Sequence, residues 1–266
     1  MFSKRNRVLL KELVKTDFKL RYQGSFLGIA WSVLKPLMLF TVMYLVFVKF
    51  LRFTDGTASY PIVLLLGISL WGFFTESTSV GMQSIVARGD LLRKIDFPKY
   101  IIVISSTMSA LISLTINTCV VIIFALITRV NFTWFALLTP FSIIQLYLFA
   151  VGVALILSTL YVKYRDVSHI WDVFLQALFY AMPIIYPITM VMDSFPLVAK
   201  IMLLNPVAQS IQDIRHNLIA PETVSTVWNT LNHAWYGLIP IFISIAVFVL
   251  GVIIFNKNSK KFAENL

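Results

Sequence analysis

Residues 101–128 read IIVISSTMSALISLTINTCVVIIFALIT, a run without a single charged side chain. Because a helix crosses a bilayer with roughly 20 mainly apolar residues, this run predicts a membrane-spanning helix. Five more stretches of the same kind occur along the chain: 30–51, 60–82, 134–161, 170–192 and 236–255. The 266 residues are 59% hydrophobic and only 13% charged, which is more apolar than a soluble domain. We therefore predict an all-α integral membrane fold, with six transmembrane helices in a single domain over 1–266.

Basic residues are distributed unevenly between the two ends of the predicted helices. With both termini in the cytoplasm, 17 of the 22 Lys and Arg residues fall in cytoplasmic segments. Such an excess of Lys and Arg marks the cytoplasmic side of membrane proteins. The net charge of +10 therefore reflects membrane topology, and we expect no nucleic-acid partner. We also expect no removable signal peptide, because the first residues are basic and lack a continuous apolar core.

Residues 4–22 have the pattern of an amphipathic helix that lies on the inner membrane surface. Leu10 and Phe18 fall on one helical face, whereas Lys15 and Lys19 fall on another. A helix of this kind docks on anionic lipid. Two interpretations remain open: a simple topology anchor, and a platform beside an entry portal for a lipid-linked substrate.

The inner loop at 87–97 is short, charged and amphipathic. Leu91, Leu92 and Ile95 recur at helical spacing among charged residues, and the proline that follows Phe97 predicts that the helix ends there. A short helix that projects inward could hold a cytoplasmic partner. The alternative is an ordinary solvated loop that carries inner positive charge.

The outer stretch from 193 to 234 is longer than a connector needs and is still apolar. Loops of this length usually have a function. We predict a short apolar helix over 195–204, an interruption at Asn205 and Pro206, and a second helix. The second helix would present one apolar face, formed by Val207, Ile211, Ile214 and Leu218. Two short helices that re-enter from outside would form a lid over a conduit, because non-helical backbone at this depth needs protein or water to satisfy it.

Few residues could carry covalent chemistry or bind a metal. One cysteine and three histidines cannot build a disulfide framework or a Cys/His cluster. Asp213 and His216 supply two ligands without a third, so we predict no metal site. No GxxxxGK[ST] loop is present, and the chain should not hydrolyse ATP by that route. Glu76, in the second predicted span, could either form a helix–helix hydrogen bond or serve a conduit.

Three parts of the sequence carry a resemblance to a known family. They are 15–47 (KTDFKLRYQGSFLGIAWSVLKPLMLFTVMYLVF), 89–105 (GDLLRKIDFPKYIIVIS), and the pair 182–187 (MPIIYP) and 204–215 (LNPVAQSIQDIR). They are similar to the interface helix and first span, the inward coupling helix, and the outer gate of one group of membrane permeases. This group is the permeases of type-2 ABC exporters, which move cell-surface polysaccharides. The resemblance covers essentially the whole chain.

The resemblance implies a half-transporter of the bacterial cytoplasmic membrane that pairs with a second copy of itself and with two copies of a separate cytoplasmic ABC ATPase. ATP and Mg would bind to that ATPase, so this chain would carry no cofactor. The implied substrate is a polysaccharide on a polyprenyl diphosphate lipid. Membrane lipids would contact the interface helix.

The same resemblance assigns roles to residues. The coupling residues would be Arg88, Asp90, Leu91, Leu92, Arg93, Lys94, Ile95 and Phe97. The interface helix and lipid portal would use Lys15, Lys19, Arg21 and Tyr22. The outer gate helices, over 194–220, would include Asn205, Pro206, Ile211 and Arg215. The family lines its conduit with aromatic residues, and the candidates here are Trp31, Phe40, Tyr44, Phe74 and Tyr186.

Two other classes of protein remain as alternatives. A secondary transporter or channel would need paired intramembrane carboxylates or repeated broken helices. An integral-membrane enzyme that modifies lipid-linked glycans would need a cluster of acids or histidines at one membrane face. The only approximation to such a cluster is Asp193, Asp213, His216, Glu222 and His233.

Overall fold

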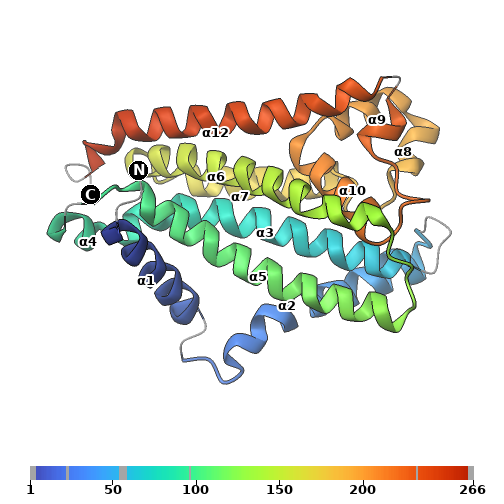
Figure 1. Ribbon diagram of the computed structural model, residues 1–266, viewed down its shortest axis with the longest axis horizontal. Helices are drawn as coiled ribbons and strands as arrows, with labels where there is room; N and C mark the ends of the chain where they lie inside the picture. Colours follow the sequence, from blue (N-terminus) through green and yellow to red (C-terminus); the bar gives the residue numbers. More distant parts are fainter. Residues whose placement is uncertain (1–3, 22–23, 54–58, 96, 232, 263–266) are drawn as a thin grey trace.

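The computed structural model of the chain describes residues 4–21, 24–53, 59–95, 97–231 and 233–262, and these ranges contain helices and connecting segments but no strand. The prediction of an all-α fold is thus confirmed. The longer helices run roughly along one axis of the molecule (Figure 1). They are α2 (Trp31–Met43), α3 (Tyr60–Ala87), α5 (Tyr100–Ile127), α6 (Thr139–Lys163), α7 (Val167–Ala181) and α12 (Leu238–Ser259).

Other helices occupy the two ends of the bundle. At one end, beside both chain termini, lie α1 (Lys4–Arg21) and α4 (Gly89–Lys94) (Figure 1). At the opposite end lie α8 (Ile188–Ser194), α9 (Pro196–Leu203) and α10 (Pro206–Leu218). The remaining short elements are η1 (Gly28–Ala30), the π-helical η2 (Tyr44–Phe50), η3 (Trp134–Leu138), α11 (Val227–Thr230) and η4 (Ala234–Gly237).

Five helical segments are long and apolar enough to cross a membrane, which makes the chain a multi-pass membrane protein. They are Trp31–Phe50, Tyr60–Ala87, Tyr100–Ile127, Trp134–Lys163 and Trp235–Ser259. The sixth stretch, predicted at 170–192, is not one continuous helix in the structure. There α7 ends at Ala181 and helix resumes only at Ile188. At about 1.5 Å per residue, the 15 residues of α7 reach about 22 Å, less than the roughly 30 Å of a hydrocarbon core.

Two prolines explain this interruption. Pro183 and Pro187 lack the backbone N–H that a continuing helix needs, and the backbone at Met182 and Pro187 is extended. The exposed carbonyl groups of a non-helical stretch must find donors when they are buried. Here Tyr60 donates its hydroxyl to the carbonyl of Ile185 over 2.8 Å. Arg215 donates to the carbonyls of Pro183 and Ile184.

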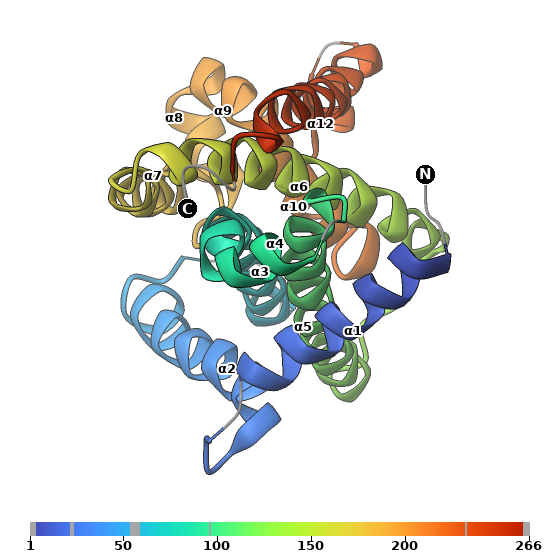
Figure 2. The same ribbon diagram turned by 90° about the vertical axis from the view of Figure 1, so that its left-hand side faces the viewer.

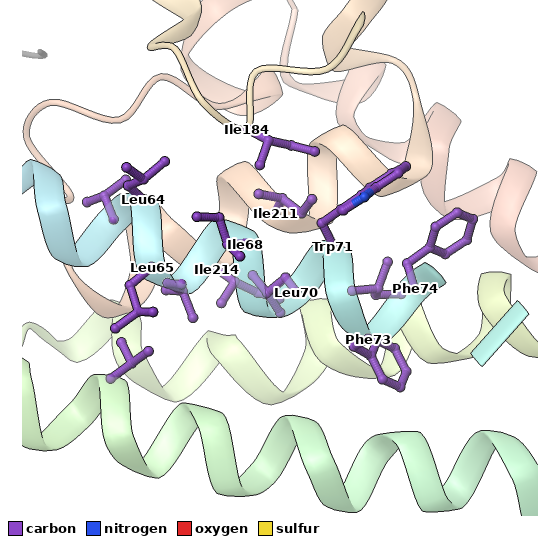
Figure 3. Packing of buried hydrophobic residues seen from close by; sticks show 14 of the residues in the cluster. Leu64, Leu65, Ile68, Leu70, Trp71, Phe73, Phe74, Ile184, Ile211 and Ile214 are labelled. Atoms are coloured by element: carbon purple, nitrogen blue, oxygen red, sulfur yellow. The ribbon is translucent and has the colours of Figure 1, made fainter. Parts of the chain in front are cut away.

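The core is built around α3, which is buried along most of its length. Its side chains pack against α5, α6 and α10, and against the interruption after α7. Figure 3 shows Ile68, Leu70 and Trp71 of α3 close to Ile211 and Ile214 of α10 and to Ile184 of the interruption. Because α5, α6 and α10 together cover most of its surface, α3 lies at the centre of the bundle.

Helices α6 and α12 approach each other closely through two glycines. A Cβ atom on Gly152 of α6 would lie 2.7 Å from the backbone N and Cα of Phe248. A Cβ atom on Gly251 of α12 would lie 2.5 Å from the carbonyl oxygen of Gly152. Small residues let helix backbones touch in this way in membrane proteins. The α6–α12 contact is therefore a backbone-to-backbone contact.

Helices α2 and α7 are the least buried of the long helices, with one buried residue each, Ser32 and Leu175. No residue is buried in the most apolar window of the span Trp31–Phe50. Figure 2 shows α2 at the edge of the bundle, with α7 also at the periphery. Both helices thus leave apolar faces uncovered by the described parts of the chain.

Candidate transport site and its coupling end

The interface helix α1 is held to the bundle by an ion pair and a hydroxyl group. Arg88, which follows α3, forms a salt bridge with Asp17 of α1. Ser105 of α5 donates its hydroxyl to Asp17 over 3.0 Å, and Arg88 also donates to this hydroxyl over 3.1 Å. Burial lowers the pKa of the Arg88 guanidinium, which nevertheless stays charged because arginine keeps its proton in proteins. This network joins α1, α5 and the start of α4.

The other predicted residues of α1 take the positions that the amphipathic pattern indicates. Lys15 and Lys19 are exposed, whereas Leu10 and Leu13 are partly buried against the core that contains Leu92 and Phe97. Arg21 is the last residue of α1. Tyr22 lies outside the residues that the structure describes.

Helix α4 is shorter than predicted and divides the proposed coupling residues into two sets. The helix ends at Lys94 instead of Phe97, because Ile95 already adopts an extended conformation. Leu92 and Phe97 are both 7% exposed and belong to this chain's own core, where Leu91 packs at the edge. The side chains available to a partner are those of Asp90, Arg93, Lys94 and Ile95, which are exposed.

A cavity of about 690 Å³ lies between α2, α3 and α5. Its wall includes two indoles, Trp31 and Trp71, together with Lys35, Glu76 and Asn117. Glu76 of α3 is half-buried and lines the cavity. Aromatic faces together with polar groups at this depth suit a ligand that is itself partly polar.

The five predicted conduit aromatics fall in different environments. Trp31 is 40% exposed and lines the cavity. Phe40 and Tyr44 stack on each other at 5.8 Å between ring centroids and are not buried. Tyr186 is half-buried and donates its hydroxyl to the carbonyl of Tyr180 over 3.0 Å. Phe74 corrects the prediction: it is 1% exposed and enclosed by other rings, so it is a core residue.

The predicted outer-gate residues make capping and packing contacts in this fold. Asn205 caps α10, since its side-chain oxygen accepts hydrogen bonds from the N–H groups of Val207 (2.9 Å) and Ala208 (3.4 Å). Pro206 begins α10, where a missing N–H is harmless. Ile211 is buried in the core against α3.

Arg215 of α10, another predicted gate residue, is 3% exposed and satisfies the interruption after α7. Its Nη1 donates to the carbonyl of Pro183 and its Nη2 to that of Ile184, each over 2.6 Å. Its Nε donates to the carbonyl of Val63 in α3 over 3.0 Å. Guanidinium groups have several donors in a rigid plane, and Arg215 uses them to fix non-helical backbone.

Sequence reasoning did not single out Asp17, although a signal for it exists. Asp17 is an acid among the many basic residues of α1 and shares a helical face with Leu10 and Leu13. An acid on the apolar face of a basic helix predicts a buried partner. Asp172, which sequence position alone would place inside a span, is exposed on α7.

The arrangement of the described helices and side chains indicates a class of protein. The described residues contain no group of three His, Cys, Asp or Glu side chains that could bind a metal. They form a membrane-embedded helical bundle with a cavity between α2, α3 and α5 and an amphipathic helix, α1, at one end. These features fit a membrane transport component.

The chain belongs to the family of ABC-2 type transporters, whose model matches residues 8–219. It is 29% identical over 260 residues to the O-antigen export system permease protein RfbA of Klebsiella pneumoniae, with 97% of this chain and 95% of that protein covered. It is also 29% identical over 187 residues to the protein of the same name in Myxococcus xanthus, covering 70% and 71% of the two chains. A second Klebsiella pneumoniae protein of that name is 26% identical over 260 residues.

Family membership has two direct consequences. The relatives are permeases, so this chain is a transport component and not an enzyme. An ABC-2 type membrane subunit also implies an ABC ATPase as its partner.

Proposed function

We propose that this chain is the membrane-spanning permease subunit of an ATP-driven exporter that moves a cell-surface polysaccharide, carried on polyprenyl diphosphate, across the bacterial cytoplasmic membrane. The observation that carries the proposal is the cavity between α2, α3 and α5, with Trp31, Trp71 and Asn117 in its wall. Sugar rings stack on indoles and hydrogen-bond to amides, each contact being weak enough to permit sliding. The full-length similarity to O-antigen export permeases supports the same substrate class.

The proposal includes six crossings, with both termini in the cytoplasm. Helix α7 begins at the end of the bundle where α6 ends, and α8 follows at the opposite end (Figure 1). Together with the interruption at 182–187, α7 therefore supplies a sixth passage between the five long helical segments. The excess of Lys and Arg near α1 and α4 supports the cytoplasmic assignment of that end.

We further propose that two copies of the chain form the transporter, each with one ATPase subunit that binds ATP and Mg. Helices α2 and α7 support this arrangement, since their apolar side chains are left uncovered by the described parts of the chain. Met38 and Val42 of α2, and Ile170, Val173 and Tyr180 of α7, are between 55% and 68% exposed. A second copy would cover them and would enclose the α2–α3–α5 cavity between two bundles.

The ATPase would dock on the exposed edge of α4. The exposed side chains at this edge are Arg93, Lys94 and Ile95, while Leu92 packs into this chain's own core and holds the helix in place. Because Arg88 joins α4 to Asp17 of α1, a push on α4 would also reach the interface helix. Lys15 and Lys19 of α1 would meanwhile contact anionic lipid beside the substrate's entry portal.

The export role is tested by deleting the gene in the cells that encode this chain. We expect surface polysaccharide to disappear and a polyprenyl-diphosphate-linked polymer to accumulate inside the cell. Re-expression of the wild-type chain should reverse both changes. Unchanged surface polysaccharide, or loss without any lipid-linked polymer inside, would contradict the proposed substrate.

The docking site is tested with Arg93→Glu/Lys94→Glu in the assembled complex. We expect the stimulation of ATP hydrolysis by substrate to fall at least tenfold, because the two charges reverse at the contact with the ATPase. The matched control is Lys257→Glu/Lys260→Glu, which reverses two exposed charges at the same end, on and just after α12. Equal stimulation in the two double variants would remove α4 as the docking site.

A further inference from the structure

A second cavity, of about 560 Å³, lies between α6, α10, α11 and α12 and has no role in the transport path described above. It is in the half of the bundle away from α1 and α4, where α10 packs behind α6 and α12 (Figure 1). Its wall has an apolar part and a polar part. The polar part contains a buried carboxylate, Asp213 of α10.

Asp213 is only 6% exposed, and its two oxygens differ in their hydrogen bonding. Oδ2 accepts a hydrogen bond from the indole N–H of Trp228 over 3.1 Å. Oδ1 is buried and has no hydrogen-bond partner in the described structure. A buried carboxylate oxygen without a donor is costly, and natural proteins seldom leave one. The oxygen thus indicates a ligand that supplies a donor in this cavity.

The charges around the cavity specify the kind of donor. No lysine or arginine lines the described wall. The neighbouring Arg215 turns its guanidinium toward the carbonyls of Pro183 and Ile184. His216 also lines the wall, one turn after Asp213, and its Nδ1 lies 3.3 Å from Oδ1 of Asn217. An ammonium group would pair with the Asp213 carboxylate, whereas a ligand with net negative charge would be repelled by it. Charge complementarity therefore selects a cationic hydrogen-bond donor.

The apolar part of the wall specifies the rest of the ligand. Phe141 and Ile144 of α6 are 70% and 55% exposed, and Ile245 of α12 is 46% exposed. Both helices belong to candidate membrane spans. Acyl chains from the bilayer can reach these side chains directly, and a ligand that contacts them and Asp213 together must be amphipathic.

We propose that this cavity binds a membrane phospholipid with a primary ammonium headgroup, which donates to Oδ1 of Asp213 while its acyl chains follow Phe141, Ile144 and Ile245. Burial raises the pKa of Asp213 to about 7, and a bound ammonium would favour its ionised form. Asp213 lies on α10, outside the five candidate spans. The site is a lipid site distinct from the surface lipid contact of α1.

The probe is a set of three lipids with identical acyl chains: phosphatidylethanolamine, phosphatidylcholine and phosphatidylglycerol. Each is titrated against the purified full-length chain in neutral detergent, and lipid retention is measured by native mass spectrometry. We expect phosphatidylethanolamine to bind about tenfold more tightly than either competitor, because one charge-assisted hydrogen bond is worth about that factor. Phosphatidylcholine keeps the positive charge but cannot donate, so it isolates the hydrogen bond.

Asp213→Asn should abolish the preference for phosphatidylethanolamine, since it removes the charge with little change in shape. The matched control is Asp193→Asn, an exposed aspartate on α8. If Asp213→Asn fails to fold, Ile144→Trp blocks the apolar part of the cavity from an exposed position and should reduce retention of all three lipids. Equal binding of the three lipids by the wild-type chain would overturn the proposal, as would an undiminished preference in Asp213→Asn or undiminished retention in Ile144→Trp.

Discussion

The contact between Gly67 and Arg215 offers a sharp test of how α10 is held. Gly67 lies in the first third of α3, against the guanidinium group of Arg215. A Cβ atom added at Gly67 would collide with Nη2, Cζ and Nε of Arg215. The guanidinium would have to move away from its partners in order to accommodate even a methyl group. We therefore expect Gly67→Ala to destabilise the protein.

The magnitude follows from the hydrogen bonds that such a movement breaks. Nη2 of Arg215 would leave the carbonyl of Ile184, and Nε would leave that of Val63. Hydrogen bonds of charged groups contribute about 1.5 to 3 kcal/mol each. Alanine returns about 1 kcal/mol through its higher helix propensity. The net loss in the free energy of unfolding should be about 2 to 5 kcal/mol, a drop of roughly 5 to 15 °C in Tm.

Thermal unfolding in detergent micelles measures this loss, and α3 itself supplies the control. Gly72→Ala adds the same methyl group where no atom lies within 4 Å, so it should be neutral or slightly stabilising. In an Arg215→Met background, Gly67→Ala should lose most of its effect, because the clash is with the arginine. The reasoning is refuted if Gly67→Ala matches Gly72→Ala, or if its effect persists in full without Arg215.

Two further predictions concern the partly buried Asp17 and the buried Asp213. Arg88→Ala leaves Asp17 without its cation, so amide hydrogen exchange over α1 should accelerate by about tenfold. The control Arg93→Ala, which changes an exposed residue, should leave the exchange rate unchanged. Equal exchange in both variants would argue against the ion pair as the anchor of α1. Burial raises the pKa of Asp213 from 3.8 to about 7, so the folded state holds a proton that the unfolded state releases, and stability should fall as pH rises from about 4 to about 7. At about 1.4 kcal/mol per pKa unit the total is on the order of 4 kcal/mol. Asp213→Asn should flatten the profile measured in lipid-free micelles, and an unchanged slope would show that Asp213 is not the group responsible.

The membrane character and most helices could be predicted from the sequence, because long apolar runs have few alternatives to spanning a bilayer. Residues 60–82 and 101–128, for example, fall within or close to α3 and α5. The run at 170–192 shows the limit of this reasoning. Its composition resembles that of the others, and although proline can kink or end a helix, composition could not show that the helix stops altogether.

The candidate site was less predictable, because periodicity does not say what a face packs against. Leu92 and Leu91 are adjacent leucines on α4, yet Leu92 is buried in this chain's own core and Leu91 only at its edge. Phe74 and Trp31 are both aromatic residues of predicted spans, but α3 is central and α2 peripheral, so one ring is enclosed and the other is open. Arg215 was predicted only as an outer-gate residue. Its hydrogen bonds to the carbonyls of Pro183 and Ile184 depend on the interruption after α7, which lies far from it in sequence.

The glycine contact between α6 and α12 determines which helices can move relative to one another. With Gly152 and Gly251 pressed backbone to backbone, neither helix can rotate about its axis without driving a side chain into the other's peptide groups. Helices α6 and α12 therefore form a rigid pair, and α3 and α10 pack against this pair through their side chains. Any widening of the bundle must therefore come from α2 and α7, whose outward faces encounter no such stop.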